Sequence, residues 1–147
     1  MIPALSLTFL CVIAGYTDLK KFIIPDWVTL PGIVTGLACP LLFHNIPLQA
    51  SLTGGLTGLL FFGLTAYLSR LALKKEALGG GDIKLAAMLG TFLGWNGLLA
   101  VIFASSLLGL VISVILILLK KINRNSPIPF GFYLSLAAIV FTWISKL

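Results

Sequence analysis

The sequence predicts an all-α membrane protein, a polytopic bundle of about six transmembrane helices. Of its 147 residues, 59% are hydrophobic and only 10% are charged, and the mean hydropathy is +1.13. An ordinary soluble domain is about one-quarter charged, and a water-soluble globule of this length could not hide so much apolar side chain. Composition therefore excludes a soluble globule, a disordered chain and a disulfide scaffold. The length suits one transmembrane domain over 1–147.

Clusters of charged residues leave four charge-free runs of 17, 43, 35 and 21 residues. About 20 apolar residues cross a bilayer core, so the first and last runs form one helix each. The second run must fold back between Pro40 and Pro47, and the third turns within Gly94-Trp95-Asn96-Gly97. The six expected helices lie near 2–17, 27–43, 49–72, 82–93, 97–119 and 130–146.

The basic residues predict the orientation of these helices. The first segment has no basic stretch before it and no clear cleavage site after it, so we expect a retained helix and not a signal peptide. With six spans, nine of the ten Lys and Arg residues share one side, and only Lys146 lies on the other. The positive-inside rule makes that side cytoplasmic and both termini non-cytoplasmic, in the cell inner membrane. The net charge of +6 then needs no nucleic-acid partner, although a basic face also favours anionic lipid.

The cysteines and the histidine carry little information. Cys11 and Cys39 lie inside apolar runs and form no C-x-x-C pair, so nothing supports a zinc site. We interpret them as small core residues and His44 as a loop residue. We expect neither a metal nor a cofactor. Glycines spaced four apart, as in 54–58 and 90–94, suit close helix packing in lipid.

Two aspartates flank the first cytoplasmic turn. Asp18 closes the first helix at the membrane boundary, where a carboxylate opposes the helix dipole. A solvated charge paired with Lys20 or Lys21 is the alternative explanation. Asp26 follows Pro25 and precedes the next apolar run, a position that suits a helix cap better than chemistry.

A third aspartate follows a run of glycines. Gly79, Gly80 and Gly81 remove side chains from the approach to Asp82, so a substrate strand or a neighbouring helix can come close to its carboxylate. Asp82 opens the fourth helix, where the dipole favours the ionised form. A flexible loop with a capping aspartate is the alternative.

Asp18 and Asp82 are more informative together. Both lie at cytoplasmic helix ends, so they share a depth, and two facing carboxylates cannot both ionise easily. One can deprotonate a water while the other, protonated, polarises a peptide carbonyl, which is aspartic-protease chemistry. The dipole favours Asp82 as the ionised member and Asp18 as the protonated one.

Three stretches of the sequence resemble the prepilin peptidases of the GxGD type. They span most of the chain and occur in the same order as in that family. GxGD alone is weak, and the ordered set is specific. The stretches are Asp18-Leu-Lys-Lys-Phe-Ile-Ile-Pro-Asp26, Gly79-Gly80-Gly81-Asp82-Ile83-Lys84-Leu85 and Ser126-Pro127-Ile128-Pro129-Phe130-Gly131.

The resemblance implies that Asp18 and Asp82 are the catalytic pair. It implies cleavage, at the cytoplasmic face, of a short basic leader that typically ends in Gly, from a prepilin-like or preflagellin-like substrate whose apolar helix stays in the membrane. The remaining motif residues are candidates for substrate binding or for shaping the loops. They are Gly79, Gly80, Gly81, Lys84, Asp26, Pro129, Phe130 and Gly131.

The sequence departs from the family in two places. A proline often follows the late Phe-Gly in the family, and Phe132 stands there in this chain. Bifunctional relatives carry an extra region with paired C-x-x-C motifs and also N-methylate the pilin. This chain has no such motif, so we expect peptidase activity without methyltransferase activity.

Two other classes of function remain open at this point. Asp18, Asp82 and Lys84 could line an ion path or a proton relay. No charge lies within the long apolar runs, however, and the two halves show no inverted repeat. A scaffold subunit is the third possibility, and it leaves the triple-glycine loop before Asp82 unexplained.

Overall fold

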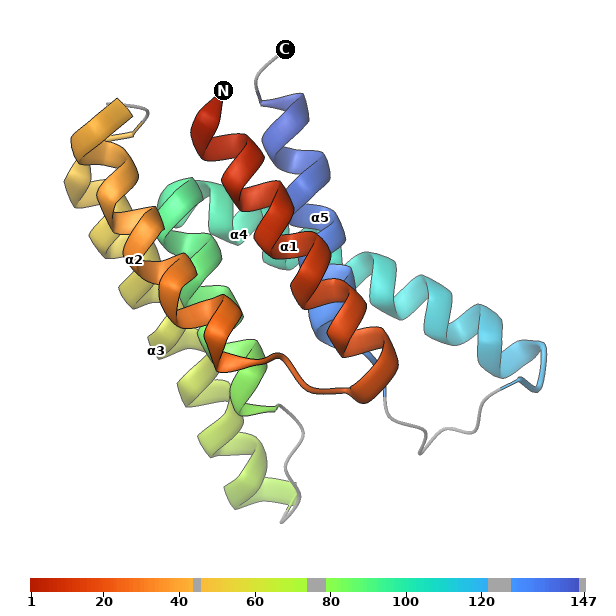
Figure 1. Cartoon of the computed structure of the whole chain (residues 1–147). Helices are drawn as coiled ribbons and strands as arrows, with labels where there is room; N and C mark the ends of the chain where they lie inside the picture. Colours follow the sequence, from red (N-terminus) through yellow and green to blue (C-terminus); the bar gives the residue numbers. More distant parts are fainter. Residues whose placement is uncertain (44–45, 74–78, 122–127, 146–147) are drawn as a thin grey trace.

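The molecule is a bundle of helices (Figure 1). The computed structural model describes residues 1–43, 46–73, 79–121 and 128–145, and no strand occurs in these ranges. The predicted residues outside them are His44, Asn45, Lys74, Lys75, Glu76, Arg124, Ser126, Pro127 and Lys146. The helices are α1 (Ile2–Lys21), α2 (Asp26–Phe43), α3 (Leu48–Leu73), α4 (Gly80–Leu118) and α5 (Phe130–Ile144).

The structure has five helices within these ranges where the sequence predicted six, because α4 covers both the fourth and the fifth expected helices. The predicted turn at 94–97 is reduced to one residue, Gly94, with φ 70° and ψ 176°. A positive φ is available to glycine without steric cost. The residues after Gly94 continue the helix, so α4 bends sharply into two arms and no loop separates them (Figure 1).

Small residues let α3 lie directly against the first arm of α4. A Cβ on Gly54 or on Gly90 would overlap the main-chain oxygen of the other residue, and a Cβ on Gly58 would overlap the main-chain oxygen of Ala86. We call Gly54, Gly58 and Gly90 the glycine seam. Close backbone approach of this kind holds helices together in lipid, where the hydrophobic effect between helices is absent.

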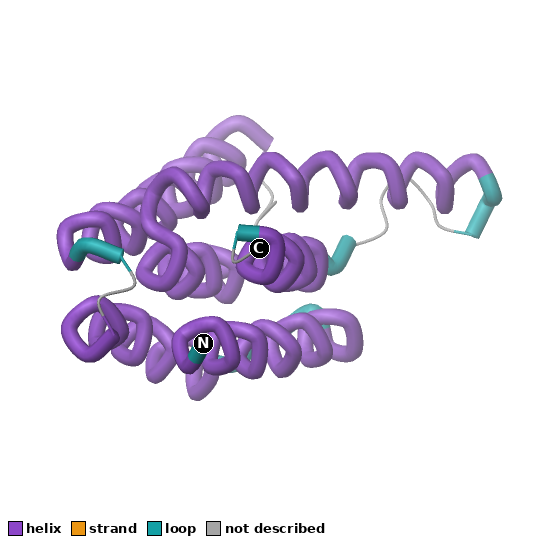
Figure 2. Tube along the Cα trace, turned by 90° about the horizontal axis from the view of Figure 1, so that it is seen from above, coloured by secondary structure: helices purple, strands orange, loops and turns teal. Residues whose placement is uncertain are grey.

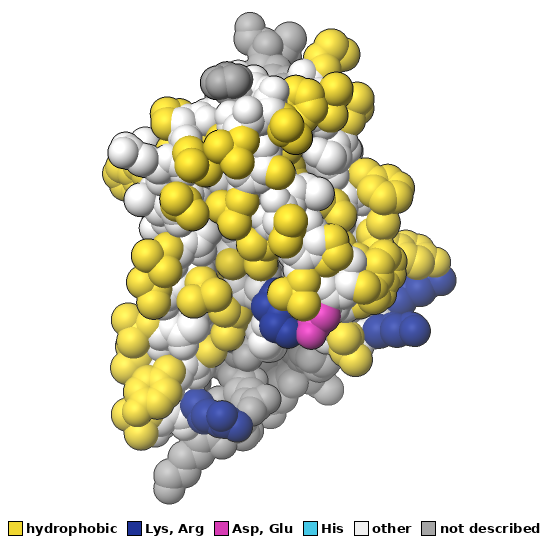
Figure 3. All heavy atoms as spheres, turned by 60° about the vertical axis from the view of Figure 1, so that its left-hand side comes forward, with side chains coloured by type: hydrophobic (Ala, Val, Ile, Leu, Met, Phe, Trp, Pro, Cys, Tyr) yellow, Lys and Arg dark blue, Asp and Glu magenta, His cyan; other side chains and the backbone are white. Residues whose placement is uncertain are grey.

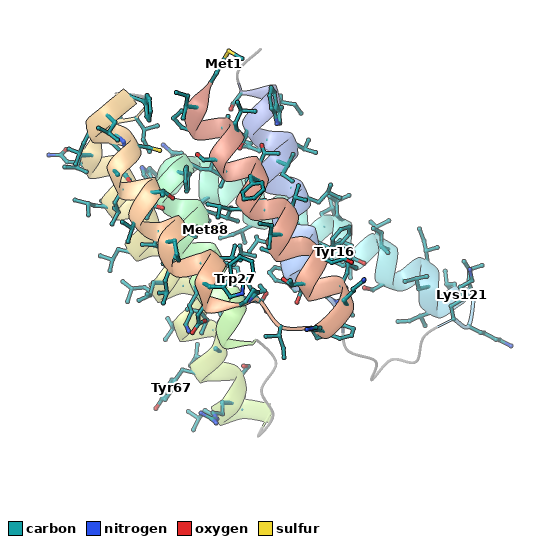
Figure 4. All side chains as sticks on the ribbon, viewed as in Figure 1. Met1, Tyr16, Trp27, Tyr67, Met88 and Lys121 are labelled. Carbon is teal, nitrogen blue, oxygen red and sulfur yellow. The ribbon has the colours of Figure 1, made fainter. Side chains whose placement is uncertain are left out.

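The same arm of α4 also supports α2. Met88 of α4 lies against Gly32 of α2, where any larger residue would overlap its sulfur (Figure 4). The buried Ser51 of α3 donates its hydroxyl to the main-chain oxygens of Thr91, at 2.6 Å, and Gly36, at 3.3 Å. One buried hydroxyl therefore ties α3 to both α4 and α2.

The last helix lies between α1 and the second arm of α4 (Figure 2). Tyr133 of α5 contacts Gly109 of α4, and Phe141 contacts Gly97. The start of α1 and the end of α5 lie at the same end of the molecule, opposite the α1–α2 connection (Figure 1). The end of α1 meets the starts of α4 and α5 away from that end, where Gly131 lies beside Asp18 and Asp82.

The surface is largely apolar. Four helices of the described chain, α1 to α4, are long and apolar enough to cross a membrane, and α5 is a shorter apolar helix. Hydrophobic side chains cover most of the face in Figure 3, and the Lys and Arg side chains gather toward one end. Such an exposed apolar surface needs lipid around it.

Candidate active site

Asp18 lies in the last turn of α1 and is only 6% exposed. The helix ends at Lys21, and its C-cap residue Phe22 has a left-handed backbone (φ 52°) and donates its N–H to the main-chain oxygen of Asp18. A left-handed conformation costs a non-glycine residue roughly 1–2 kcal/mol. The sharp turn sends the chain back across the end of α1 toward α4.

The carboxylate of Asp18 caps the start of α5. Its Oδ2 accepts the main-chain N–H of Phe132 at 2.9 Å. The first N–H groups of a helix have no partner within the helix, and the N-cap residue of α5, Pro129, makes no side-chain hydrogen bond to them. A side chain from α1 therefore does what an N-cap residue does in other helices. A proline at position 132 would have no N–H and could not make this bond.

Asp82 lies in the first turn of α4, directly after the triple glycine. Gly79 is the N-cap, and its main-chain oxygen accepts the N–H of Asp82 at 3.1 Å. The Oδ1 atom of Asp82 is buried and has no hydrogen-bond partner within the described residues. A buried polar atom without a partner is costly, so this oxygen is suited to a proton, a water or a substrate group.

The two carboxylates meet at Gly131 of α5. A Cβ built on Gly131 would lie 3.0 Å from Oδ2 of Asp18 and 3.0 Å from Oδ1 of Asp82. Both aspartates therefore face the same point, and the missing side chain of Gly131 leaves room for them. Because both oxygens lie 3.0 Å from one point, ionisation of one carboxylate disfavours ionisation of the other. The dipole argument from sequence considered the end of α1 and the start of α4, and it missed the start of α5, where the Phe132 N–H bonds to Asp18.

A pocket of about 260 Å³ opens onto both aspartates. It lies where the α1–α2 connection meets the start of α4, and Tyr16 and Trp27 lie near the two helix ends that this connection joins (Figure 4). Three of its lining residues are glycines, so main chain is accessible beside the carboxylates. Its lining comprises Asp18, Phe22, Ile23, Ile24, Gly79, Gly80, Gly81 and Asp82.

The analysis of single residues missed three pocket residues, Phe22, Ile23 and Ile24, of which Ile24 is the buried one. It is 5% exposed and lies between the triple glycine and α5. A Cβ on Gly81 would come within 2.9 Å of Ile24 Cβ, and a Cβ on Gly131 within 2.6 Å of Ile24 Cδ1. Ile24 belongs to the motif stretch that ends in Ile24-Pro25-Asp26, so the motif included it. An isoleucine by itself, however, indicates only a buried position and not a place beside the carboxylates.

The structure separates the remaining predicted residues from this pocket. Asp26 is the first residue of α2, and both its carboxylate oxygens accept the Lys84 ammonium at 2.7 Å, so the side chain forms an ion pair with α4. Phe130 packs against Phe62 of α3, with the rings tilted by 41° and their centroids 5.9 Å apart. Pro129 only precedes α5 as its N-cap.

Comparison with known proteins agrees with this arrangement. A model of the type IV leader peptidase family matches residues 5–114, a stretch that includes both aspartates. The chain belongs to that family. Three members similar to it carry the name prepilin leader peptidase/N-methyltransferase. They come from Aeromonas salmonicida strain A449 (39% identical over 99% of this chain), Xanthomonas campestris pv. campestris (37% over 92%) and Pseudomonas aeruginosa (36% over 97%).

The chain spans about half the length of these leader peptidases, since the matches cover 49%, 47% and 48% of the relatives. No solved structure matches it. Family membership and the apolar helices together show an integral membrane protein. The earlier resemblance to prepilin peptidases is confirmed, while the roles of individual residues remain predictions.

Proposed function

We propose that this chain is a membrane aspartic endopeptidase that removes the basic leader from prepilin-like proteins, with Asp18 and Asp82 as the catalytic pair. The observation that carries the proposal is the convergence of the two carboxylates on Gly131, each at 3.0 Å from the position of its missing Cβ. The family match and the prepilin peptidase names of the relatives supply the substrate class. The matched half of those relatives would be their peptidase unit, here a single transmembrane domain.

The chemistry requires only groups that line the pocket. One carboxylate takes a proton from a water while the other, protonated, hydrogen-bonds to the carbonyl oxygen of the scissile peptide. The water oxygen bonds to the carbonyl carbon, which becomes tetrahedral, and the protonated aspartate gives its proton to the leaving nitrogen as the C–N bond breaks. The proton taken from the water stays on the pair. The two aspartates end the cycle with one proton between them, as they began it.

The proposed orientation places this end of the bundle at the cytoplasmic face of the inner membrane and both termini on the other side. Lys20 and Lys21 end α1 next to Asp18, and Lys84 lies one turn beyond the triple glycine. Basic residues at one end of the helices favour the cytoplasmic side. A basic leader would then reach the aspartates from the cytoplasm while the apolar helix of its pilin stays in lipid.

The test is a cleavage assay in membranes that contain a prepilin and one form of this chain. We expect the wild type to shorten the prepilin, and Asp18→Asn and Asp82→Asn each to abolish cleavage, because Asn keeps the shape but cannot carry the shared proton. Asp26→Asn is the matched control, since Asp26 is 57% exposed and ion-paired outside the pocket. Normal insertion and cleavage by Asp18→Asn or Asp82→Asn would refute the two-aspartate mechanism.

A further inference from the structure

A buried hydrophobic side chain lies beside the point that the two carboxylates face. Ile24 reaches from the α1–α2 connection toward α5, and its Cδ1 lies 2.6 Å from where a Cβ of Gly131 would be. That same position is 3.0 Å from each carboxylate. One added methyl group would therefore meet the isoleucine and both aspartates at once.

The position of Ile24 is fixed from three sides. Its side chain is buried. Its main-chain N and O would lie 3.3 and 3.4 Å from a Cβ on Gly81, so the connection rests directly on the glycine loop. Two residues later, Asp26 is paired with Lys84 of α4 at 2.7 Å. A side chain held in this way cannot easily swing aside to admit a larger group.

A peptide that is cleaved here must place its carbonyl carbon next to the two carboxylates. The residue that contributes this carbonyl has its Cα one bond away, so its side chain lies nearer to the aspartates than any other side chain of the substrate. Of the three hydrophobic residues that line the pocket, Phe22, Ile23 and Ile24, Ile24 is the buried one, and its Cδ1 lies beside the Gly131 position that both carboxylates face.

We propose that Ile24 is a specificity-determining residue, which limits the substrate residue on the leader side of the scissile bond to one with little or no side chain. This inference rests on the proposed function. The isoleucine occupies the volume that a larger substrate side chain would need, and the glycine loop opposite it offers main chain in place of a side-chain pocket. Selection arises from exclusion by Ile24 and not from attraction to the small residue.

The experiment compares two prepilins that differ only in the last residue of the leader, glycine or alanine. Solubilised wild type, Ile24→Ala and Ile24→Val are each assayed with both prepilins, and kcat/KM is measured for every pair of enzyme and prepilin. One extra carbon in an apolar site changes kcat/KM by roughly 10–200-fold. We expect Ile24→Ala to raise the alanine-to-glycine ratio of kcat/KM about tenfold and Ile24→Val to raise it less.

Ile33→Ala is the matched control, because Ile33 is partly buried in α2 and lines a different groove of the bundle. Its ratio should equal that of the wild type even if its overall rate falls. An unchanged ratio in active Ile24→Val or Ile24→Ala, or an equal rise in Ile33→Ala, would overturn the inference. If the wild type cleaves neither prepilin, the proposed function fails and the inference fails with it.

Discussion

Glycines bring helices together in two regions of this protein, and the regions use them differently. In the glycine seam, Gly54 and Gly90 set main chain against main chain, and nothing enters the contact. At the aspartate site, Gly81 and Gly131 make room for side chains, namely the two carboxylates and Ile24. The seam holds the first arm of α4 in place, and the site uses that arm to present Asp82.

This difference separates stability from catalysis. A substitution in the seam moves a backbone, because no flexible side chain can give way. A substitution at the site displaces carboxylates or an isoleucine, which alters chemistry before it alters the fold. The following substitutions probe that separation.

The largest expected effect is in the seam. Gly90→Ala places a methyl group against the main-chain oxygen of Gly54, and overpacking of this kind typically costs about 1–3 kcal/mol and occasionally more. We expect a loss near the upper end, about 3 kcal/mol, in the free energy of unfolding of the solubilised protein. Gly63→Ala is the control, because nothing lies within 4 Å of its Cβ position. Equal stability of the two variants would show that the seam can spread apart.

The next effect is at the start of α5. Gly131→Ala puts a methyl group 3.0 Å from each carboxylate, so we expect kcat for prepilin cleavage to fall about 100-fold, equivalent to about 2.7 kcal/mol in the barrier. The unfolding transition should move much less than in Gly90→Ala. Gly15→Ala serves as the control, since its Cβ would meet Phe132 and Ser135 at 3.4 Å, an ordinary contact. Full activity of Gly131→Ala would mean that the aspartates do not work in this arrangement.

A smaller difference is expected within the triple glycine. Gly81→Ala would push Ile24 Cβ, 2.9 Å from the new methyl group, whereas Gly80 has nothing within 4 Å. We expect Gly81→Ala to lower kcat/KM about tenfold, or about 1.4 kcal/mol, and Gly80→Ala to lower it less. The middle residue of the glycine run would then be the replaceable one. The measurement is prepilin cleavage by both variants at matched expression, and a larger loss for Gly80→Ala contradicts this account.

The sequence predicted the helical membrane class, the position of the two aspartates at helix ends and the position of the bend at Gly94, because each depends on local pattern. Apolar run length and glycine placement can be read directly along the chain. The sequence could not predict that α4 continues through 95–97 as helix. One residue with a positive φ, Gly94, changes the direction of the chain as well as a loop would. Capping of α5 by Asp18 was also out of reach, because the two groups are 114 residues apart.

Ile24 and Asp26 show the same limit from opposite directions. Ile24 was not singled out from the sequence and lies beside the carboxylates, whereas Asp26 was expected to cap a helix and pairs with Lys84. The residue type predicts whether a side chain makes apolar or polar contacts. It does not predict which helix or loop, distant in sequence, provides those contacts.

The smallest expected effect concerns that ion pair, which spans α2 and α4 beside the site without lining its pocket. Asp26 and Lys84 are 57% and 41% exposed, and exposed pairs contribute only about 0.2–1 kcal/mol. Asp26→Asn and Lys84→Met should each lower the free energy of unfolding by about 0.5 kcal/mol and leave cleavage within about threefold of the wild type. The reversed pair, Asp26→Lys with Lys84→Asp, should recover most of the lost stability, because opposite charges at these two positions again attract each other and link α2 to α4. If the reversed pair instead loses more cleavage activity than the two single variants together, a charge at one of these positions contacts the substrate. Asp26 would then belong to the substrate-binding site and not only to the packing around it.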